Sequence, residues 1–204
     1  FYHYDLGNEF YSKWLDDTMT YSSALFNSST ESLEKAQENK YKNICKNINP
    51  KPEDHILEIG CGWGGFMEYA IKHHNVKVTG LTISKAQHDF TKKRLFEAGL
   101  SERAKVVLKD YRNQKGQFDG IASIEMFEAV GEKYWPVYFN SLKNLMKNGA
   151  KSTLQIITIS DDLFPEYRKR VDFIQKYIFP GGMLPSRKAL EKQFLQVGLK
   201  SINL

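Results

Sequence analysis

The sequence has few cysteines and no long apolar run. Only two of its 204 residues are cysteine, and Cys45 and Cys61 lie in patterns typical of a helix and of a glycine-rich loop. This usage does not indicate a disulfide framework, so we expect a reducing, cytoplasmic setting. No apolar run approaches the roughly 20 residues that a bilayer requires, which excludes a membrane-spanning helix from this sequence.

Internal repeats, low-complexity segments and a secretory signal are also missing. The length suits one domain, and because the chain begins at Phe1 we expect it to be a piece of a longer protein. The formal net charge of +5 fits a solvated lysine-rich surface. It equally fits a surface that attracts nucleic acid or acidic lipid, and composition leaves these alternatives open.

The clearest motif is a glycine-rich segment. An apolar run ending at Ile59 meets four glycines within residues 60–65, and a helical pattern follows. A buried strand that enters a helix through such a turn begins a nucleotide-binding βαβ unit, because glycine lets a ligand approach the backbone. The spacing Glu-x-Gly-x-Gly-x-Gly from Glu58 differs from the dinucleotide pattern. It favours S-adenosylmethionine, which has no pyrophosphate, over NAD.

Strands and helices are predicted to alternate along the chain. The patterns predict strands at 56–59, 76–82, 104–108, 118–124 and 153–159, helices at 31–48, 66–74, 85–98, 132–147, 166–179 and 186–197, and a strand beginning at 200. Such alternation indicates a parallel sheet with helices on both faces. We expect an α/β fold in which residues 1–50 form an N-terminal cap and first helix and residues 51–204 form the core.

Aromatic side chains are concentrated ahead of the first long helix. They are Phe1, Tyr2, Tyr4, Phe10, Tyr11, Trp14, Tyr21 and Phe26. The spacing of Phe10, Trp14 and their neighbours predicts a short helix. These side chains can cover an open edge of the core, or they can form a lid that excludes water from a ligand site. Both alternatives stay open.

Polar residues follow the predicted strands, where an open parallel sheet binds its ligand. Thr82 and Gln87 follow the second strand and can hydrogen-bond hydroxyl groups. Asp110 follows the third strand and can accept from an adenine amine, while Tyr111 can lie against the ring. Each residue alone could equally be a solvated loop residue. Their joint placement at one edge favours a binding site.

Two carboxylates follow the fourth strand within an apolar stretch. Glu125 and Glu128 stand among Ile124, Met126 and Phe127. A buried carboxylate is costly unless it is paired or used, and such surroundings raise its pKa toward that of a base. The alternative role is to offset the dipole at the start of a helix. Glu128 is the functional candidate, and for Glu125 the two roles stay equally open.

Six short motifs occur in a fixed order along essentially the whole chain. They are His3–Asn8, Met19–Ser22, Leu57–Gly64, Gly80–Ser84, Met126–Gly131 and Tyr177–Gly182. Together they resemble the cyclopropane-fatty-acyl-phospholipid synthases, which include the mycolic acid cyclopropane synthases. The resemblance implies the class I methyltransferase fold, a Rossmann-like three-layer sandwich that is C-terminally incomplete here, with S-adenosylmethionine as methyl donor.

The resemblance also implies roles for single residues. The cofactor would be held by Tyr21 and Ser22 from the cap, Gly60 and Gly62 at its methionine end, Thr82 and Gln87 at its ribose, and Tyr111 and Arg112 at its adenine. Family members transfer the methyl group to a cis double bond of an acyl chain, often within a phospholipid. The resulting carbocation, which aromatic faces can stabilise, loses a proton from the added methyl and closes a cyclopropane ring.

In the best-known family members a bicarbonate ion is the base, held by a Cys, a Glu, a His and a later Tyr. Glu128 matches the Glu, whereas Ser23 and Gln155 stand at the Cys and His positions, and the Tyr would lie beyond Leu204. A Ser hydroxyl and a Gln amide can still hydrogen-bond an anion. Glu128, Ser23 and Gln155 are therefore the candidate catalytic residues, with bicarbonate left open.

The expected function is cyclopropanation of an unsaturated phospholipid acyl chain. The alternatives are a lipid C-methyltransferase that gives a methyl branch, a small-molecule N-methyltransferase, and a non-catalytic module that binds an anionic surface. No metal site is indicated, and nothing resembles a nucleic-acid module. Under the expected function, the basic surface would dock the protein peripherally on anionic membrane. The oligomeric state is not indicated, and an exposed sheet edge is expected because the final hairpin is incomplete.

Overall fold

A parallel five-stranded sheet lies at the centre of the computed structural model, which describes residues 7–202. The strand order is β3-β2-β1-β4-β5. The strands are β1 (His55–Ile59), β2 (Lys77–Thr82), β3 (Ala104–Leu108), β4 (Phe118–Ile124) and β5 (Met146–Gln155). Because all neighbours run parallel, the carboxyl ends of the strands meet at one edge. The order reverses between β1 and β4, which places the topological switch point there.

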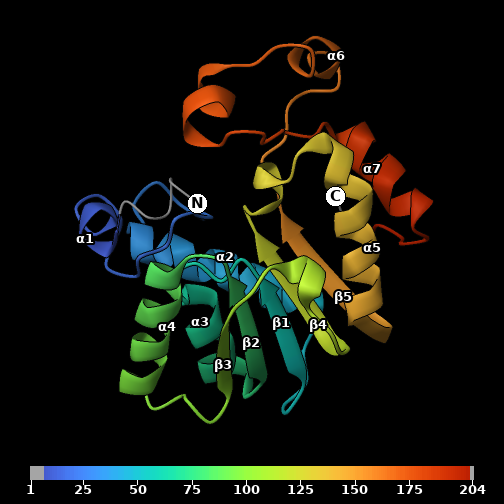
Figure 1. Cartoon of the computed structure of the whole chain (residues 1–204). Coiled ribbons are helices and arrows are strands. Elements are labelled where there is room, and N and C mark those ends of the chain that lie inside the picture. The colour runs from blue at the N-terminus through green and yellow to red at the C-terminus, as the bar shows by residue number, and fades with distance from the viewer. Residues whose placement is uncertain (1–6, 203–204) are drawn as a thin grey trace.

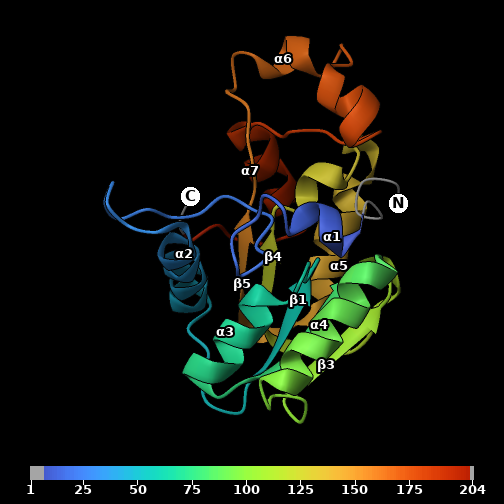
Figure 2. The ribbon, with the colours of Figure 1, turned by 90° about the vertical axis from the view of Figure 1, so that its left-hand side faces the viewer.

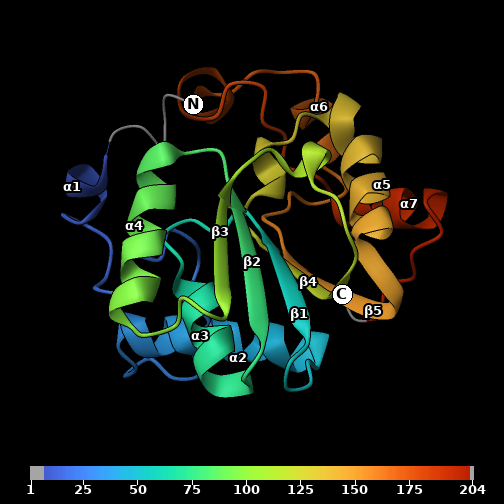
Figure 3. The same cartoon turned by 60° about the horizontal axis from the view of Figure 1, so that its bottom comes forward.

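Helices cover both faces of the sheet, so the predicted three-layer α/β fold is confirmed (Figure 1). One face carries α2 (Leu33–Ile48), α3 (Gly65–His74) and α4 (Lys85–Glu97), and the other carries α5 (Trp135–Leu145) and α7 (Arg187–Gln196), as Figure 3 shows from below. Each face has its own buried apolar cluster, one including Phe66 and Met67 and the other including Phe127 and Phe139.

Helix α2 forms because its ends are capped and one side is apolar. Ser32 accepts a hydrogen bond from the backbone N–H of Lys35 at the start, and Asn49 adopts the left-handed conformation at the end. Ile44 and Cys45 are buried against the sheet. Cys45 is therefore a core residue, as its position in the helical pattern predicts.

Short helices and irregular segments complete the described chain. They are α1 (Asn8–Tyr11), η2 (Tyr111–Asn113), η3 (Phe127–Ala129), η4 (Glu132–Tyr134), α6 (Phe164–Tyr167) and η5 (Ile174–Ile178). Figure 2 shows the segment from α6 to η5 standing beyond the carboxyl ends of β4 and β5. Within residues 7–202, no helix is long and apolar enough to cross a membrane.

The structure corrects four element predictions. The fifth strand runs from Met146 to Gln155 rather than over 153–159, so the preceding helix ends at Leu145. The helix predicted at 166–179 is replaced by α6, an irregular stretch and η5. Residues 200–202 form no strand. The short helix predicted around Phe10 and Trp14 is α1, which ends at Tyr11, before Trp14. Phe1, Tyr2, Tyr4 and most of the motif His3–Asn8 lie outside the described residues, as do Asn203 and Leu204.

Candidate active site

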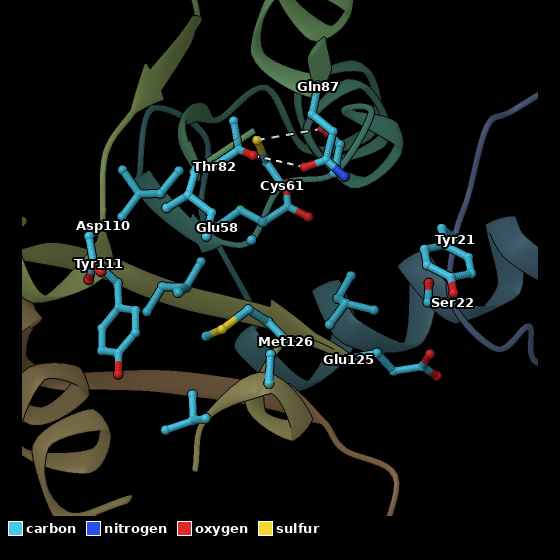
Figure 4. A pocket seen from close by; sticks show the side chains of 18 of the residues that line it. Tyr21, Ser22, Glu58, Cys61, Thr82, Gln87, Asp110, Tyr111, Glu125 and Met126 are labelled. Carbon is cyan, nitrogen blue, oxygen red and sulfur yellow. Dashed lines mark hydrogen bonds between the residues drawn. The ribbon is translucent and has the colours of Figure 1, made fainter. Parts of the chain in front are cut away.

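A cavity of about 540 Å³ lies at the carboxyl edge of the sheet. Its lining includes every residue that the sequence assigns to the cofactor, namely Tyr21, Ser22, Gly60, Gly62, Thr82, Gln87, Asp110, Tyr111 and Arg112. Figure 4 shows Tyr111 on one side of this first cavity and Tyr21 on the opposite side, with Glu58 between them. These residues come from four separate parts of the chain: the cap and the segments at the ends of β1, β2 and β3, which meet because parallel strands end at one edge.

The glycine loop forms the inner wall of the first cavity. Gly60 has a φ of +85°, and a Cβ added there would lie 2.8 Å from Cγ of Met126. Gly62 has a φ of +51°, and a Cβ there would meet no atom of the described residues within 4 Å. The backbone N–H groups of Gly60 and Cys61 donate to the carbonyl of Leu81, which ties the loop to the end of β2. Glycine is thus required at position 60 by both conformation and space.

The residues after β2 are organised by hydrogen bonds to one another. The Thr82 hydroxyl donates to Oε1 of Gln87 at 2.8 Å and accepts from the backbone N–H of Ser84 at 3.1 Å. Because Oε1 of Gln87 is occupied, the group that Gln87 can offer to a ligand is its amide N–H. This arrangement suits a ligand hydroxyl that accepts a hydrogen bond.

After β3, Asp110 is bound to Arg112 rather than open toward the cavity. Its carboxylate accepts from the backbone N–H and Nε of Arg112, both at 2.9 Å, and from Nη2 at 2.6 Å. The Arg112 guanidinium holds the pKa of this carboxyl below its usual range. Asp110 therefore fixes Arg112 at the cavity mouth, beside Tyr111, whose ring packs edge-on against Tyr138.

Two buried titratable groups line or adjoin the first cavity. Glu58 is only 2% exposed, and its Oε2 has no hydrogen-bond partner among the described residues. Burial raises the pKa of Glu58 to about 8, with Lys40 and Arg94 acting in the opposite sense. Lys40 is also 2% exposed and donates to the Ser22 hydroxyl at 2.5 Å, while burial lowers its pKa to about 8.

Lys40 is a site residue that the sequence reasoning missed. An amphipathic pattern normally leaves lysine on the solvent side of a helix. The available signal was its spacing: Lys40 follows Ala36 by four residues and precedes Ile44 by four, so it shares their buried face.

A second cavity, of about 480 Å³, adjoins the first. Its apolar lining consists of Trp14, Leu15, Ala24, Phe26, Leu33, Ala129, Ile157 and Phe179. The two cavities share Thr20, Tyr21, Ser22, Glu125 and Ala129. A ligand in either cavity would therefore contact the same short wall.

Of the three catalytic candidates, Ser23 and Glu128 line the second cavity, whereas Gln155 does not line it and contacts Ser23 and Glu125, which do. Ser23 donates to Oε1 of Glu125 through its backbone N–H at 2.9 Å and its hydroxyl at 2.6 Å. Nε2 of Gln155 donates to the same oxygen at 2.8 Å and to the Ser23 carbonyl at 3.2 Å. Ser23 and Gln155 thus converge on Glu125, which has a φ of +46° and donates its own N–H to the Gln155 carbonyl.

Glu128 lines the same cavity but is held elsewhere. Its Oε1 accepts from the backbone N–H of Ile157, and its Oε2 has no partner within residues 7–202. Burial raises the pKa of Glu128, and the nearby Glu125 carboxylate acts in the same direction. The backbone carbonyl of Glu128 accepts from Met183, so this residue joins η3 to the segments that follow β5.

The aromatic cap packs against the core, and its Tyr21 and Ser22 line the first cavity. Tyr11 is fully buried against Trp63 of the glycine loop, and Nε1 of Trp63 donates to Oδ1 of Asn8 at 2.8 Å. Nη1 of Arg94 donates to the carbonyls of Thr18 at 2.7 Å and of Trp63 at 3.3 Å. The cap is thereby fastened to the loop that lines the first cavity.

Comparison with known proteins shows the family and the fold of this chain. The family model for mycolic acid cyclopropane synthetase matches residues 1–204. The chain is 41% identical over 186 residues to cyclopropane-fatty-acyl-phospholipid synthase of Escherichia coli, covering 90% of the chain and 46% of that protein. It is 34% identical over 206 residues to a probable fatty acid methyltransferase of Pseudomonas putida, covering 100% of the chain and 52% of that protein.

The fold is shared with solved relatives. The structure superposes on mycolic acid cyclopropane synthase CmaA1, solved with SAH and CTAB, with a TM-score of 0.90 and 28% identity, covering 99% of this chain and 74% of the other. The chain spans about half the length of the curated relatives that it matches. On the family match and these identities, the chain belongs to the mycolic acid cyclopropane synthetase family of S-adenosylmethionine-dependent methyltransferases.

Proposed function

We propose that this chain carries the active site of an S-adenosylmethionine-dependent enzyme that methylates the cis double bond of an unsaturated phospholipid acyl chain and forms a cyclopropane ring. The observation that carries the proposal is the pair of adjoining cavities. The first is lined by the glycine loop and the polar strand ends, the second is largely apolar, and Tyr21, Ser22 and Glu125 belong to both. Two ligands would thus meet at one wall.

The residues of the first cavity fit S-adenosylmethionine. Gly60 and Gly62 carry no side chain on the inner wall, and Glu58, whose Oε2 has no partner among the described residues, lines the same cavity and suits a cationic group. Gln87 offers an amide donor suited to a ribose hydroxyl, while Tyr111 suits an aromatic base. When bound, the cofactor supplies an electrophilic methyl group on a sulfonium.

The second cavity fits an acyl chain. Most of its lining is aliphatic or aromatic, as a hydrocarbon ligand requires. The ring centroids of Tyr21, in the shared wall, and of Trp14, in the second cavity alone, lie 5.3 Å apart. These rings can exclude water and present π faces to a developing cation. The names of the Escherichia coli and Pseudomonas putida relatives support a fatty acyl substrate.

A small-molecule N-methyltransferase remains the alternative from another substrate class. The carboxylates of Glu125 and Glu128 in the second cavity would suit a cationic amine. The apolar lining favours the acyl chain, since an amine does not need it. A lipid C-methyltransferase that leaves a methyl branch would use the same two cavities and differs in how the cation is resolved.

The segment of residues 163–177, beyond the carboxyl ends of β4 and β5, suits contact with an anionic bilayer. It exposes the apolar side chains of Leu163, Val171, Phe173, Ile174 and Tyr177. Arg168, Lys169, Arg170 and Lys176 lie among them in the sequence. Exposed apolar and basic groups together are the features of a peripheral membrane contact, and Figure 2 places this segment on the side where the cavities lie. We call residues 163–177 the docking segment.

The test is mass spectrometry and proton NMR of unsaturated phospholipid vesicles incubated with the purified protein and S-adenosylmethionine. The proposal expects each modified acyl chain to gain one methylene unit while its alkene signal disappears. A gain in mass with a retained or shifted alkene, or with a methyl branch, would instead establish the C-methyltransferase alternative. Methylation of soluble amines with unchanged lipid would establish the N-methyltransferase.

A further inference from the structure

We propose that Glu125 is the catalytic base of this site, and that its carboxylate stands where the family resemblance predicts a bicarbonate ion. The inference rests on the proposed function and deepens it by naming the group that takes the proton. It follows from the contacts of Glu125, from its place between the cavities and from the charges around it.

The contacts show that the predicted anion-binding groups are already used. The two residues at the Cys and His positions of the family, Ser23 and Gln155, supply three hydrogen-bond donors, and all three end on Oε1 of Glu125. Oε2 of Glu125 accepts no hydrogen bond from residues 7–202. One oxygen is therefore held in place and the other is available to a ligand. The Glu125 carboxylate thus takes the place of a bound anion, and it is covalently attached to the chain.

The location is where a methyl group would pass between two ligands. Of the carboxylates that line the cavities in the described part of the chain, Glu58 and Asp110 line only the first and Glu128 only the second. Glu125 lines both. Figure 4 shows its carboxylate directed toward Tyr21 and Ser22 of the cap. A base in this position would lie beside a methyl group that passes from a ligand in the first cavity to a ligand in the second.

The charges oppose a second anion. A bicarbonate ion beside Ser23 would meet the carboxylates of both Glu125 and Glu128, which already interact unfavourably. The buried ammonium of Lys40 lies close enough to interact with Glu125 but donates to the Ser22 hydroxyl. The Glu125 carboxylate thus already supplies the negative charge that a bound bicarbonate would bring.

The step that Glu125 performs is balanced in atoms and electrons. The π pair of the double bond forms a bond to the methyl carbon while the carbon–sulfur bond breaks and its electron pair stays on sulfur. This leaves a positive charge on the neighbouring carbon of the acyl chain. A C–H bond of the new methyl then gives its electron pair to that carbon, which closes the ring, and the proton passes to Oε2 of Glu125.

The backbone of Glu125 allows a direct test. Its φ of +46° is in the region that favours glycine, so Glu125→Gly removes the carboxylate without opposing the local conformation. The donors of Ser23 and Gln155 would then surround a space that a small carboxylate can enter. Glu125→Gln keeps the space filled and removes only the base.

The experiment compares turnover of unsaturated phospholipid by the wild type and both variants, in CO₂-free buffer and with added bicarbonate or formate. We expect wild-type turnover to be independent of bicarbonate. Both variants should lose about 10²–10⁴-fold, the usual contribution of a general base. Formate or bicarbonate should restore Glu125→Gly by at least about tenfold and leave Glu125→Gln unchanged, since its amide occupies the site.

Glu53→Gly is the matched control. Glu53 is also a glutamate with positive φ, +70°, but it lies before β1 and pairs with Lys77 and Arg103 at the opposite end of the strands. This variant should keep wild-type turnover and show no response to formate.

Calorimetry separates failure of this inference from failure of the proposed function, because it does not depend on turnover. Formate should bind Glu125→Gly and not the wild type, while S-adenosylhomocysteine should bind both with similar affinity. Bicarbonate binding to the wild type, or wild-type turnover that needs bicarbonate, would overturn the inference. If the wild type leaves lipid unchanged while formate still binds only Glu125→Gly, the anion position stands and the lipid reaction is wrong.

Discussion

The two cavities differ in how they are built. The first is lined mainly by the ends of β1 to β4 and by backbone atoms of the glycine loop, so its shape follows from the parallel topology. The second lies between the cap and the residues after β5, and its polar wall depends on contacts such as that between Ser23 and Gln155, which are 132 positions apart. We infer that the first cavity, which we call the cofactor side, is sensitive to changes in the sheet. The second cavity, which we call the substrate side, depends on how the cap packs against the residues after β5.

The largest expected effect concerns the buried charge of the first cavity. The pKa of Glu58 is raised from 4.5 to about 8 in the folded state. A raised pKa gives stability that is fully present below the unfolded value and is lost as pH rises through the folded value. The free energy of unfolding should therefore fall between pH 5 and pH 8, by on the order of 3 kcal/mol, and Glu58→Gln should remove most of this fall.

Urea unfolding of both proteins at several pH values measures this difference. Lys40 titrates in the other sense, because its pKa is depressed to about 8 and its cost is relieved above that pH. The range from pH 5 to 7.5 therefore avoids the titration of Lys40, and the comparison with Glu58→Gln separates Glu58 from Glu128, whose pKa is also raised. If the free energy of unfolding depends equally on pH in the two proteins, the pKa of Glu58 is not raised. Water would then solvate Glu58 more than its burial indicates.

The next prediction concerns the backbone conformation and the space available at Gly60 in the glycine loop. Gly60→Ala combines left-handed strain with a contact of 2.8 Å to Met126, and we expect it to cost about 2–3 kcal/mol of stability. Gly99→Ala is the control, because Gly99 has a φ of +70° and a Cβ there meets nothing in the described structure within 4 Å. It should cost only about 1 kcal/mol. Equal losses in urea unfolding would mean that strain, and not space, sets the requirement at position 60.

On the substrate side, Phe26→Asp should reduce turnover of unsaturated phospholipid about tenfold, because it places a charge in an apolar wall. Phe26 lines the second cavity alone, so the affinity for S-adenosylhomocysteine should stay unchanged. Phe96→Asp alters an exposed aromatic residue of α4 and serves as control. A loss of cofactor affinity in Phe26→Asp would show that the two cavities are not independent.

The smallest effect concerns the docking segment. Replacing both Lys169 and Arg170 by Glu should weaken binding to anionic vesicles, since each basic group near such a surface contributes about 1 kcal/mol. Turnover on vesicles should fall a few-fold and become less sensitive to salt, while turnover of detergent-dispersed lipid should not change. Co-sedimentation at several salt concentrations measures the binding. Equal binding by the variant and the wild type would remove this segment from the membrane contact.

The cofactor side was accessible from the sequence because it rests on local patterns and one topological rule. β3 and β4 lie where their apolar runs predict them, and the residues after each strand line one cavity because parallel strands end together. The family resemblance also indicated that Ser23 and Gln155 can hydrogen-bond an anion, with bicarbonate left open. It could not show that the anion is Glu125, since this depends on a left-handed backbone at one position and on contacts across more than 100 residues.

The substrate side was harder to predict because its apolar residues imitate core patterns. Ile156 and Ile157 extend the apolar run of the fifth strand, yet the strand ends at Gln155 and Ile157 lines the second cavity. The pattern at 166–179 predicts a helix, but the apolar residues there stay exposed, and a short helix without a packing partner is marginal. Lys40 shows the converse, a charged residue on a buried face.

The fastening of the cap to the glycine loop determines how the site can open. Arg94 bonds to carbonyls on both sides of the junction, and Trp63 bonds to Asn8 across it. We therefore expect the cap and the glycine loop to move together, and not the cap alone about a flexible hinge. We expect the backbone amides of the cap and of the loop to exchange with solvent as one cooperative unit in hydrogen exchange.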